Sequence, residues 1–300
     1  MSTSADEIGL ARPGDEAALQ AFLQRRLASS MFFLSNLNQA GLTADGQIDP
    51  GQRGSGAYAV AWLGDDVVGV AAQFVNNSVH LQAPPLLVPD LVETLLGATG
   101  RPLRGLIGPL AQVQAAERLR PPGVQVQIDE IDDLLTLILG LIRLPDGLQD
   151  GSLHGRLAQA DDIDLLASWR RDYLVEVQNL DETRADSAQA QQQRRRYLEQ
   201  LVAAGDIFLL EDGGRPVATC AYTARIPEAV LLGGVWTPDA LRGEGYGRAV
   251  VAAALLNARD EGAGLGVLFA DVNNEAAQTA YRSLGFDRTG DFRILLFQRP

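Results

Sequence analysis

Hydrophobic and polar positions predict the same order of elements at the start of both halves of the chain. In the first half, a short strand and turn at residues 8–15 precede a helix from 16 to about 27. The second half repeats this order with a strand and turn at 155–162 and a helix from 163 to about 177. Both starts share Leu-Ala followed, after three intervening residues, by an aspartate placed to cap the helix. We interpret this as a weak internal repeat.

Each half continues with a second helical stretch and two alternating apolar runs joined by turn residues. The turns contain Gly64 in the first half and Gly213 in the second. Gly-Asp and Asp-Gly steps between apolar runs are typical of β-hairpins. We therefore expect mixed α/β domains with an antiparallel start to each sheet, with helices at 31–40 and 189–203 and hairpins over 58–74 and 207–223.

A stretch rich in turn-forming residues, 144–152, divides the chain nearly in half. The length of 300 residues also suggests two domains, and each half is long enough to bury its own core. We expect domains over residues 1–146 and 153–300.

The net charge of the chain limits the kinds of molecule that it is expected to bind. The formal net charge is −13, which argues against general nucleic-acid binding because that requires a basic surface. The acidic balance mildly favours a cationic small substrate through electrostatic steering, although an acidic surface more often serves solubility.

The remaining composition excludes several kinds of structure. A single cysteine, Cys220, rules out an internal disulfide framework and fits a reducing cytoplasm. The two histidines, His80 and His154, lie far apart in the sequence, so we expect no metal site. No apolar run reaches the roughly 18 residues that a membrane-spanning helix needs, so we expect no membrane partner.

One segment of the second half points to chemistry. A strand expected at 229–236 ends in Val235-Trp236-Thr237-Pro238, and a helix follows from 249 to 257. Between them lies the glycine loop, Arg242-Gly243-Glu244-Gly245-Tyr246-Gly247-Arg248. In the order strand, glycine-rich turn, helix, several backbone N–H groups and the helix dipole favour an anion at the helix N-terminus. Such a site suits a diphosphate.

Two common diphosphate motifs do not fit this loop. A dinucleotide fingerprint starting at Gly243 requires its last glycine where Arg248 stands. A P-loop requires a lysine, and the chain has none. A glycine-rich turn without a ligand remains as an alternative.

A second motif lies downstream of the loop. It reads Asn274-Glu275-Ala276-Ala277, then Tyr281, then Gly285-Phe286. In spacing and order, the two motifs together resemble those of the GNAT superfamily of N-acetyltransferases, and the resemblance covers roughly residues 153–298. It implies two tandem acyl-CoA N-acyltransferase-like domains of mixed α+β class, each with a mostly antiparallel central sheet flanked by helices. The first half lacks both motifs and resembles a degenerate copy.

The resemblance also implies how acetyl-CoA is held. Backbone amides from Gly243 to Arg248 would bind its pyrophosphate, and the glycines allow close approach. Val235, Trp236 and Thr237 would pair through the main chain with the pantetheine arm, and Gly233-Gly234 suits a bulge that opens the slot. A main-chain N–H near Val235 would stabilise the oxyanion. Asn274 is placed to bind the cofactor or to cap a helix.

Two residues are candidates for acid and base chemistry. Tyr281 stands where the family usually has the general acid that protonates the CoA thiolate, although a tyrosine on a short helix also often only packs. Glu228, at the start of the strand before the glycine loop, is the nearest match to the general base. Asp271 on the next strand is an alternative, and both also fit structural roles.

From the resemblance we expect an acetyl-CoA-dependent N-acetyltransferase in which a primary amine attacks directly in a ternary complex. The alternative is a non-catalytic acyl-CoA-binding or regulatory module, because no clear base is present. The expected partner is a small-molecule or peptide amine, without nucleic acid or membrane, and a homodimer is left open. No metal is expected.

Overall fold

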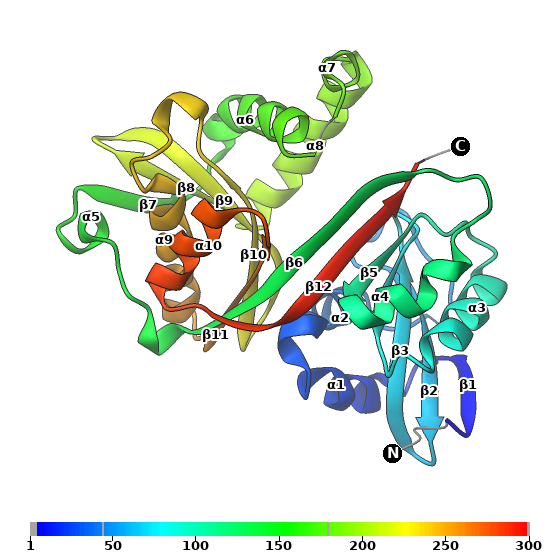
Figure 1. Cartoon of the computed structure of the whole chain (residues 1–300). Helices are drawn as coiled ribbons and strands as arrows, with labels where there is room; N and C mark the ends of the chain where they lie inside the picture. The colour runs from blue at the N-terminus through cyan, green and yellow to red at the C-terminus, as the bar shows by residue number, and fades with distance from the viewer. Residues whose placement is uncertain (1–4, 44, 179, 299–300) are drawn as a thin grey trace. The chain divides into compact units, whose positions relative to one another are not determined.

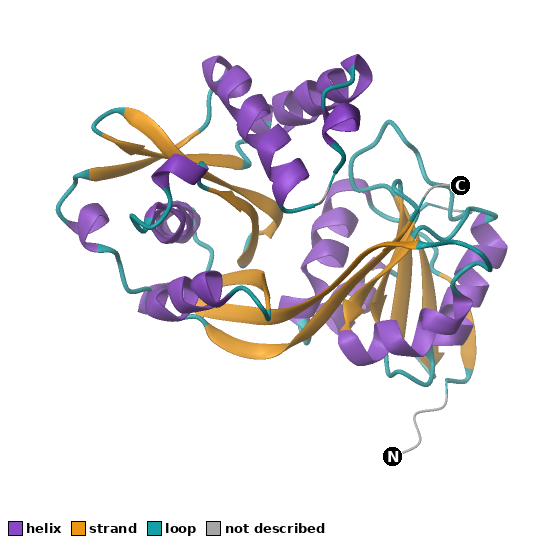
Figure 2. Ribbon diagram, turned by 45° about the horizontal axis from the view of Figure 1, so that its top comes forward, coloured by secondary structure: helices purple, strands orange, loops and turns teal. Residues whose placement is uncertain are grey.

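Both halves of the chain begin with the elements that the hydrophobic pattern predicts. The computed structural model describes residues 5–43, 45–178 and 180–298 (Figure 1). The predicted mixed α/β class is confirmed, and Figure 2 shows helices packed against strands in both halves. In the first half the elements are β1 (Glu7–Leu10), α1 (Glu16–Gln24), α2 (Leu27–Ala40), β2 (Gly56–Leu63), β3 (Asp66–Phe74), β4 (Ser78–Gln82), α3 (Val88–Thr99), β5 (Gly105–Pro109), α4 (Leu110–Ala116) and β6 (Val126–Ile138).

The second half repeats this pattern. Its elements are α5 (Asp146–Gln149), β7 (Leu153–Leu157), α6 (Ile163–Glu176), α7 (Glu182–Ala185), α8 (Ala188–Ala203), β8 (Ile207–Asp212), β9 (Arg215–Ile226), β10 (Ala229–Trp236), α9 (Tyr246–Asp260), β11 (Leu265–Asp271), α10 (Glu275–Leu284) and β12 (Asp287–Phe297). No helix among the described residues is long and apolar enough to cross a membrane.

The strands follow the same topology in both halves. The order in the sheet is β1-β2-β3-β4-β5-β12-β6-β11-β10-β9-β8-β7. Strands β1 to β4 pair antiparallel and β4 pairs parallel with β5. Strands β7 to β10 likewise pair antiparallel and β10 pairs parallel with β11. The internal repeat expected from the sequence is therefore a repeat of strand order.

The compact units of the chain do not follow the linker at 144–152. One unit contains Met1–Leu134, Phe269–Val272 and Arg288–Pro300, and the other contains Leu135–Leu268 and Asn273–Asp287. The reason is strand pairing, because β12 lies antiparallel beside β5 with Leu295 opposite Leu106. Leu295 is fully buried in the core of the first unit. Burial of this apolar strand, rather than linker composition, sets the unit boundary.

In the second unit, helices cover both faces of strands β8 to β10. Successive residues of a strand point to opposite faces. On β9, the Cys220 thiol lies 3.6 Å from the carbonyl of Val250 on α9, while the neighbouring Ala221 packs into a core formed by α6, α8 and β8. Helices α6 and α8 therefore cover one face and α9 the other, as Figure 1 shows.

Candidate active site

The C-terminal end of β10 is irregular where the sequence places two glycines. Strand β10 pairs with β11 from Ala229 to Leu232 only. Against β9, its register shifts between Gly233 and Trp236, and Gly234 has a φ of +60°. One extra residue on β10 makes this a β-bulge, which bends the strand. The bulge predicted from Gly233-Gly234 is present, and the last residues of β10 lie beyond the pairing with β11.

The glycine loop leads directly into helix α9. Gly243 and Gly245 have φ values of +90° and +80°, a region that side chains other than glycine rarely adopt. Gly245 is the N-terminal cap of α9. Within the described residues, no backbone N–H from Gly243 to Arg248 has a hydrogen-bond partner. The loop thus has the run of free donors at a helix N-terminus that an anion requires.

The two arginines of the loop have different environments. The Arg242 guanidinium donates to Glu176 at the end of α6 at 2.7 and 2.9 Å and lies over the Trp236 ring at 4.9 Å. By contrast, the Nε of Arg248 is buried and has no hydrogen-bond partner in the part of the chain described. Arg242 is therefore held by the protein, and Arg248 supplies a cationic donor beside the free amides.

These features fit a diphosphate. An orphaned guanidinium nitrogen and consecutive backbone donors satisfy phosphate oxygens without rearrangement. Two other predicted cofactor residues lie at the edge of the loop: Glu244 is exposed, and the Tyr246 hydroxyl donates to Asp212 at 2.5 Å. Asn274 caps helix α10, where its Oδ1 accepts the Ala277 N–H at 3.0 Å. Its capping role accounts for the side chain.

Thr237 and Val235 lie against the first turn of α9. A Cβ added to Gly247 would lie 3.5 Å from the Thr237 Oγ1 and 3.8 Å from the Val235 Cγ1. The end of β10 and the start of α9 therefore approach closely. The predicted cofactor-binding residues between 235 and 248 therefore all lie where β10 ends and α9 begins.

Tyr281 on α10 is buried, with 8% of its surface exposed. Its ring stacks edge-on against Phe286 at 6.1 Å. Burial raises the pKa of its hydroxyl, and nearby Cys220 and Tyr173 raise that pKa further. The hydroxyl therefore stays protonated over the physiological range, as a general acid requires.

A cavity of about 200 Å³ lies between helices α6 and α8 and strands β9 and β10. Tyr173, which lies close enough to raise the Tyr281 pKa, lines this cavity with its neighbours on α6, whereas Cys220 contributes to the lining from β9 although its thiol faces α9. The cavity also borders the bulge through Gly234 and Trp236. The remaining lining residues are Leu166, Trp169, Arg170, Gln178, Tyr197, Leu198, Leu201, Ile207, Thr219, Ala221 and Thr223.

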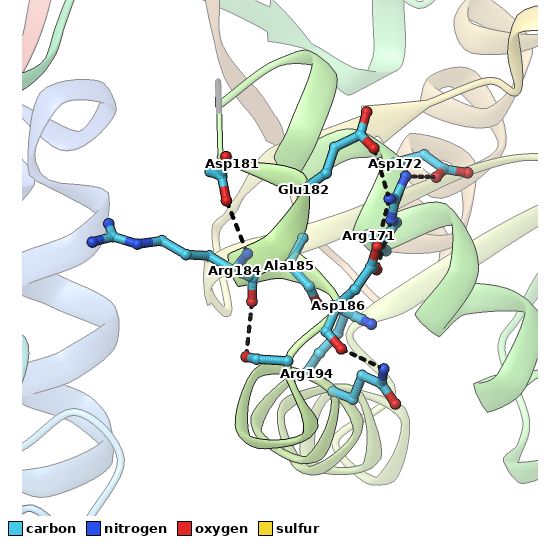
Figure 3. A network of polar contacts seen from close by, with 10 residues as sticks. Arg171, Asp172, Asp181, Glu182, Arg184, Ala185, Asp186 and Arg194 are labelled. Carbon is cyan, nitrogen blue, oxygen red and sulfur yellow. Dashed lines mark hydrogen bonds and ion pairs between the residues drawn. The ribbon is translucent and has the colours of Figure 1, made fainter.

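The helices that wall the cavity are tied together by a polar network (Figure 3). Arg171 on α6 donates to both carboxylate oxygens of Asp186 at 3.0 and 2.8 Å. Asp181 caps α7 through the Arg184 N–H at 3.1 Å, and Arg194 on α8 donates to the Ala185 carbonyl at 3.1 Å. The bidentate pair joins α6 to the end of α7, and the bond from Arg194 joins α8 to α7, so the three helices form one wall.

The structure does not bring Glu228 to this site. Glu228 is exposed in the turn between β9 and β10, at the opposite end of β10 from Trp236. At about 3.3 Å per residue, the strand separates the two by roughly 25 Å. The assignment of Glu228 as general base is therefore corrected, because proximity in sequence placed it at the wrong end of the strand. The alternative, Asp271, ends β11 and belongs to the first unit.

The residues that line the cavity from the helices were not evident from the sequence. Trp169, Arg170 and Tyr173 lie on α6, and Tyr197 lies on α8. No motif marks them. The available signal was the spacing of Trp169 and Tyr173, four residues apart, which places two aromatic rings on one face of the predicted helix.

Comparisons with known proteins support the fold. Residues 165–286 match the sequence profile of the acetyltransferase (GNAT) family. No curated protein matches the chain.

Several solved structures share the architecture over nearly the whole chain. A GCN5-related N-acetyltransferase from Sphaerobacter thermophilus has a TM-score of 0.55 at 14% identity, covering 99% of this chain and 98% of its own. One from Kribbella flavida has a TM-score of 0.54 at 19% identity, covering 92% and 95%. A tandem GNAT protein from the clavulanic acid biosynthesis pathway has a TM-score of 0.52 at 14% identity, covering 98% and 99%. At these identities the likeness concerns the fold.

Proposed function

We propose that the chain transfers an acetyl group from acetyl-CoA to a primary amine, because residues 165–286 match the model of the acetyltransferase (GNAT) family. The observation that carries the proposal is the position of Tyr281. Its buried, protonated hydroxyl lies near Tyr173, a residue of the cavity that borders the β10 bulge. At the other end of the bulged segment, the glycine loop offers free backbone donors for a diphosphate.

In this proposal some residues bind acetyl-CoA and Tyr281 transfers a proton. The amides from Gly243 to Arg248 and the Arg248 guanidinium hold the diphosphate. The main chain of Val235, Trp236 and Thr237 lies alongside the pantetheine arm, and an N–H near Val235 stabilises the oxyanion. Acetyl-CoA supplies the thioester. The amine nitrogen attacks its carbonyl carbon, the carbon–sulfur bond breaks, and the Tyr281 hydroxyl protonates the departing sulfur.

The amine must lose a proton without help from Glu228. In the part of the chain that the structure describes, no Asp or Glu lines the cavity. Because the walls are largely apolar, the charged form of an amine is disfavoured there and its pKa falls on entry. We therefore propose that the amine attacks as the neutral base, its excess proton goes to water, and Tyr281 recovers its own proton from solvent.

A CoA-release assay over a panel of primary amines tests this proposal. We expect amine-dependent release of CoA by the wild-type chain and none by Gly245→Asp, because a carboxylate at that position repels the diphosphate. Saturable CoA binding without release for any amine would instead assign the chain to the alternative, a non-catalytic acyl-CoA-binding module.

A further inference from the structure

The cavity lined by Tyr173 also contains an arginine that has no polar partner among the described residues. Arg170 on α6 contributes to the lining, and its guanidinium carbon lies 4.9 Å from the Tyr173 ring centre and 5.7 Å from that of Tyr197. Within the described residues, Arg170 has no hydrogen bond and no carboxylate partner. This is unusual in a chain whose net charge is −13, because acidic side chains outnumber the basic ones.

The stacking leaves the hydrogen-bonding edge of Arg170 available. A guanidinium contacts an aromatic ring through its flat face, while its N–H donors lie in its plane. The tyrosine rings thus contact the group without accepting hydrogen bonds from its donors. A planar fork of N–H groups held in this way matches a carboxylate, which accepts two parallel hydrogen bonds.

A second donor in the same wall also lacks a partner. The Nε1 of Trp236 is buried without a hydrogen bond in the described part of the chain. Its ring meets Tyr173 edge-on at 6.0 Å. A buried N–H without a partner costs free energy unless a ligand supplies an acceptor. Among the described residues, the cavity therefore has two unused donors and no carboxylate in its lining, which also includes aromatic side chains.

We propose that this cavity selects an acceptor amine that also carries a carboxylate, with an aromatic or branched apolar body between the aromatic walls. Arg170 binds the carboxylate, and the rings of Trp169 and Tyr173 pack against the body. This inference deepens the proposed function and rests on it for the fate of the amine. Such an amino-acid-like acceptor has no net charge as a zwitterion, so the acidic protein does not repel it.

Matched pairs of amines test the selection. The pairs are L-phenylalanine and its amide, L-leucine and its amide, and 4-(aminomethyl)benzoate and benzylamine, each with acetyl-CoA. We expect kcat/KM to favour the carboxylate member by roughly 10- to 100-fold, the range of a charge-assisted hydrogen-bonded pair. Arg170→Met keeps the apolar stem and should remove that preference. Arg170→Lys keeps the charge without the fork and should retain part of it.

Arg196→Met is the matched control. Arg196 is exposed on α8 beside Tyr197, does not line the cavity, and its replacement changes the net charge equally. We expect its preference to equal that of the wild type. Melting curves for all variants verify that each is folded.

Ligand binding gives a readout that does not depend on turnover. Of the three tryptophans in the chain, Trp169 and Trp236 line the cavity, so their fluorescence reports its occupancy. We expect saturable quenching by L-phenylalanine that Arg170→Met weakens at least about 10-fold and Arg196→Met leaves unchanged.

The outcomes separate this inference from the proposed function. Turnover without a carboxylate preference, or with a preference that Arg170→Met retains, overturns the inference and leaves acetyl transfer standing. If the carboxylates bind in an Arg170-dependent way but are not turned over, the inference is supported and the proposed acetyl transfer is contradicted. If the carboxylate-bearing amines are neither bound nor turned over, the inference is overturned. Arg170-dependent use of succinyl-CoA with neutral amines also overturns it, because the carboxylate would then belong to the acyl donor.

Discussion

At the scale of single residues, the chemistry depends on how burial sets proton affinities. Tyr281→Phe removes only the hydroxyl that we propose as general acid, so we expect kcat to fall roughly 100-fold with little change in the KM for acetyl-CoA. Tyr222→Phe is the matched control. Its buried hydroxyl donates to the Ala254 carbonyl at 2.6 Å, away from the cavity lining, so its loss should lower stability but not kcat. If Tyr281→Phe has the same kcat as the wild type, Tyr281 is not the general acid.

The same tyrosine predicts the shape of the pH profile. Because burial raises the Tyr281 pKa above its usual value of 10.0, the acid form persists on the alkaline side. The neutral amine becomes more abundant as pH rises. We therefore expect kcat/KM to increase between about pH 6 and 9 without a descending limb in that range. A bell-shaped profile with an alkaline pKa below about 9 would contradict this account.

A buried carboxylate in the first unit predicts a pH dependence of stability. Burial, together with the negative charges of Glu130, Asp271 and Asp133, raises the pKa of Asp132 on β6 to about 7. The folded state therefore binds this proton more tightly than the unfolded state. Its contribution to stability is present below the unfolded pKa of 3.8 and is lost as pH rises towards about 7.

We expect Asp132→Asn to raise the free energy of unfolding by about 1–3 kcal/mol at about pH 8, and by much less at about pH 4.5. Urea unfolding at the two pH values measures the difference. Asp287→Asn, at an exposed position, should change stability little at either pH. A gain that is the same at both pH values would show that titration of Asp132 is not its cause.

Some of the candidate site residues could be predicted from the sequence alone, and others could not. The glycine loop and Tyr281 were predictable because they belong to motifs with fixed local spacing. Glu228 was misassigned because its distance from the loop depends on strand direction and length. Arg170 was missed because the role that we propose for it rests on its having no polar partner among the described residues, and only the packing of α6 against α8 reveals this.

At the scale of elements, the junction between β10 and α9 depends on glycines in left-handed backbone conformations. Gly245 caps α9 with a φ of +80°, so Gly245→Ala should cost about 1 kcal/mol of stability. It should also raise the KM for acetyl-CoA, because the amides that follow are reoriented. Gly97→Ala is the control: Gly97 lies in α3 with open space around it, so the change should stabilise the protein and leave this KM unchanged. An unchanged KM in Gly245→Ala would argue against the cradle.

The hairpins and the bulge were predictable because turn chemistry is local. The helix boundaries were less so: α9 begins at Tyr246, inside the glycine loop, and ends at Asp260, three residues beyond the predicted end. The loop residues therefore form the first turn of the helix, which is what leaves their N–H groups free.

At the scale of the whole molecule, the last strand of the chain belongs to the core of the first unit. Leu295 on β12 is fully buried there, so Leu295→Ala should cost about 2–5 kcal/mol. Hydrogen exchange should show the loss of protection in β2 to β5, before it appears in β8 to β10. Leu141→Ala, at a position 68% exposed, should have little effect. Loss of protection first in β8 to β10 would contradict the strand arrangement.

The hydrophobic pattern predicted two similar halves but not the place of β12. The pattern marks β12 as an apolar strand, but its partner β5 is far away in sequence, and nothing local specifies that pairing. The repeat was therefore visible in sequence, whereas the membership of β12 in the first unit was not.

The central claim is direct acetyl transfer to an amine, and isotope tracing tests it most directly. The chain is incubated with acetyl-CoA labelled in the acetyl carbonyl and with L-phenylalanine, and the products and the intact protein are weighed by mass spectrometry. We predict labelled N-acetylated amine in amounts equal to the CoA released, with the protein mass unchanged. Label retained on the protein, or CoA released without labelled amine, would contradict the account.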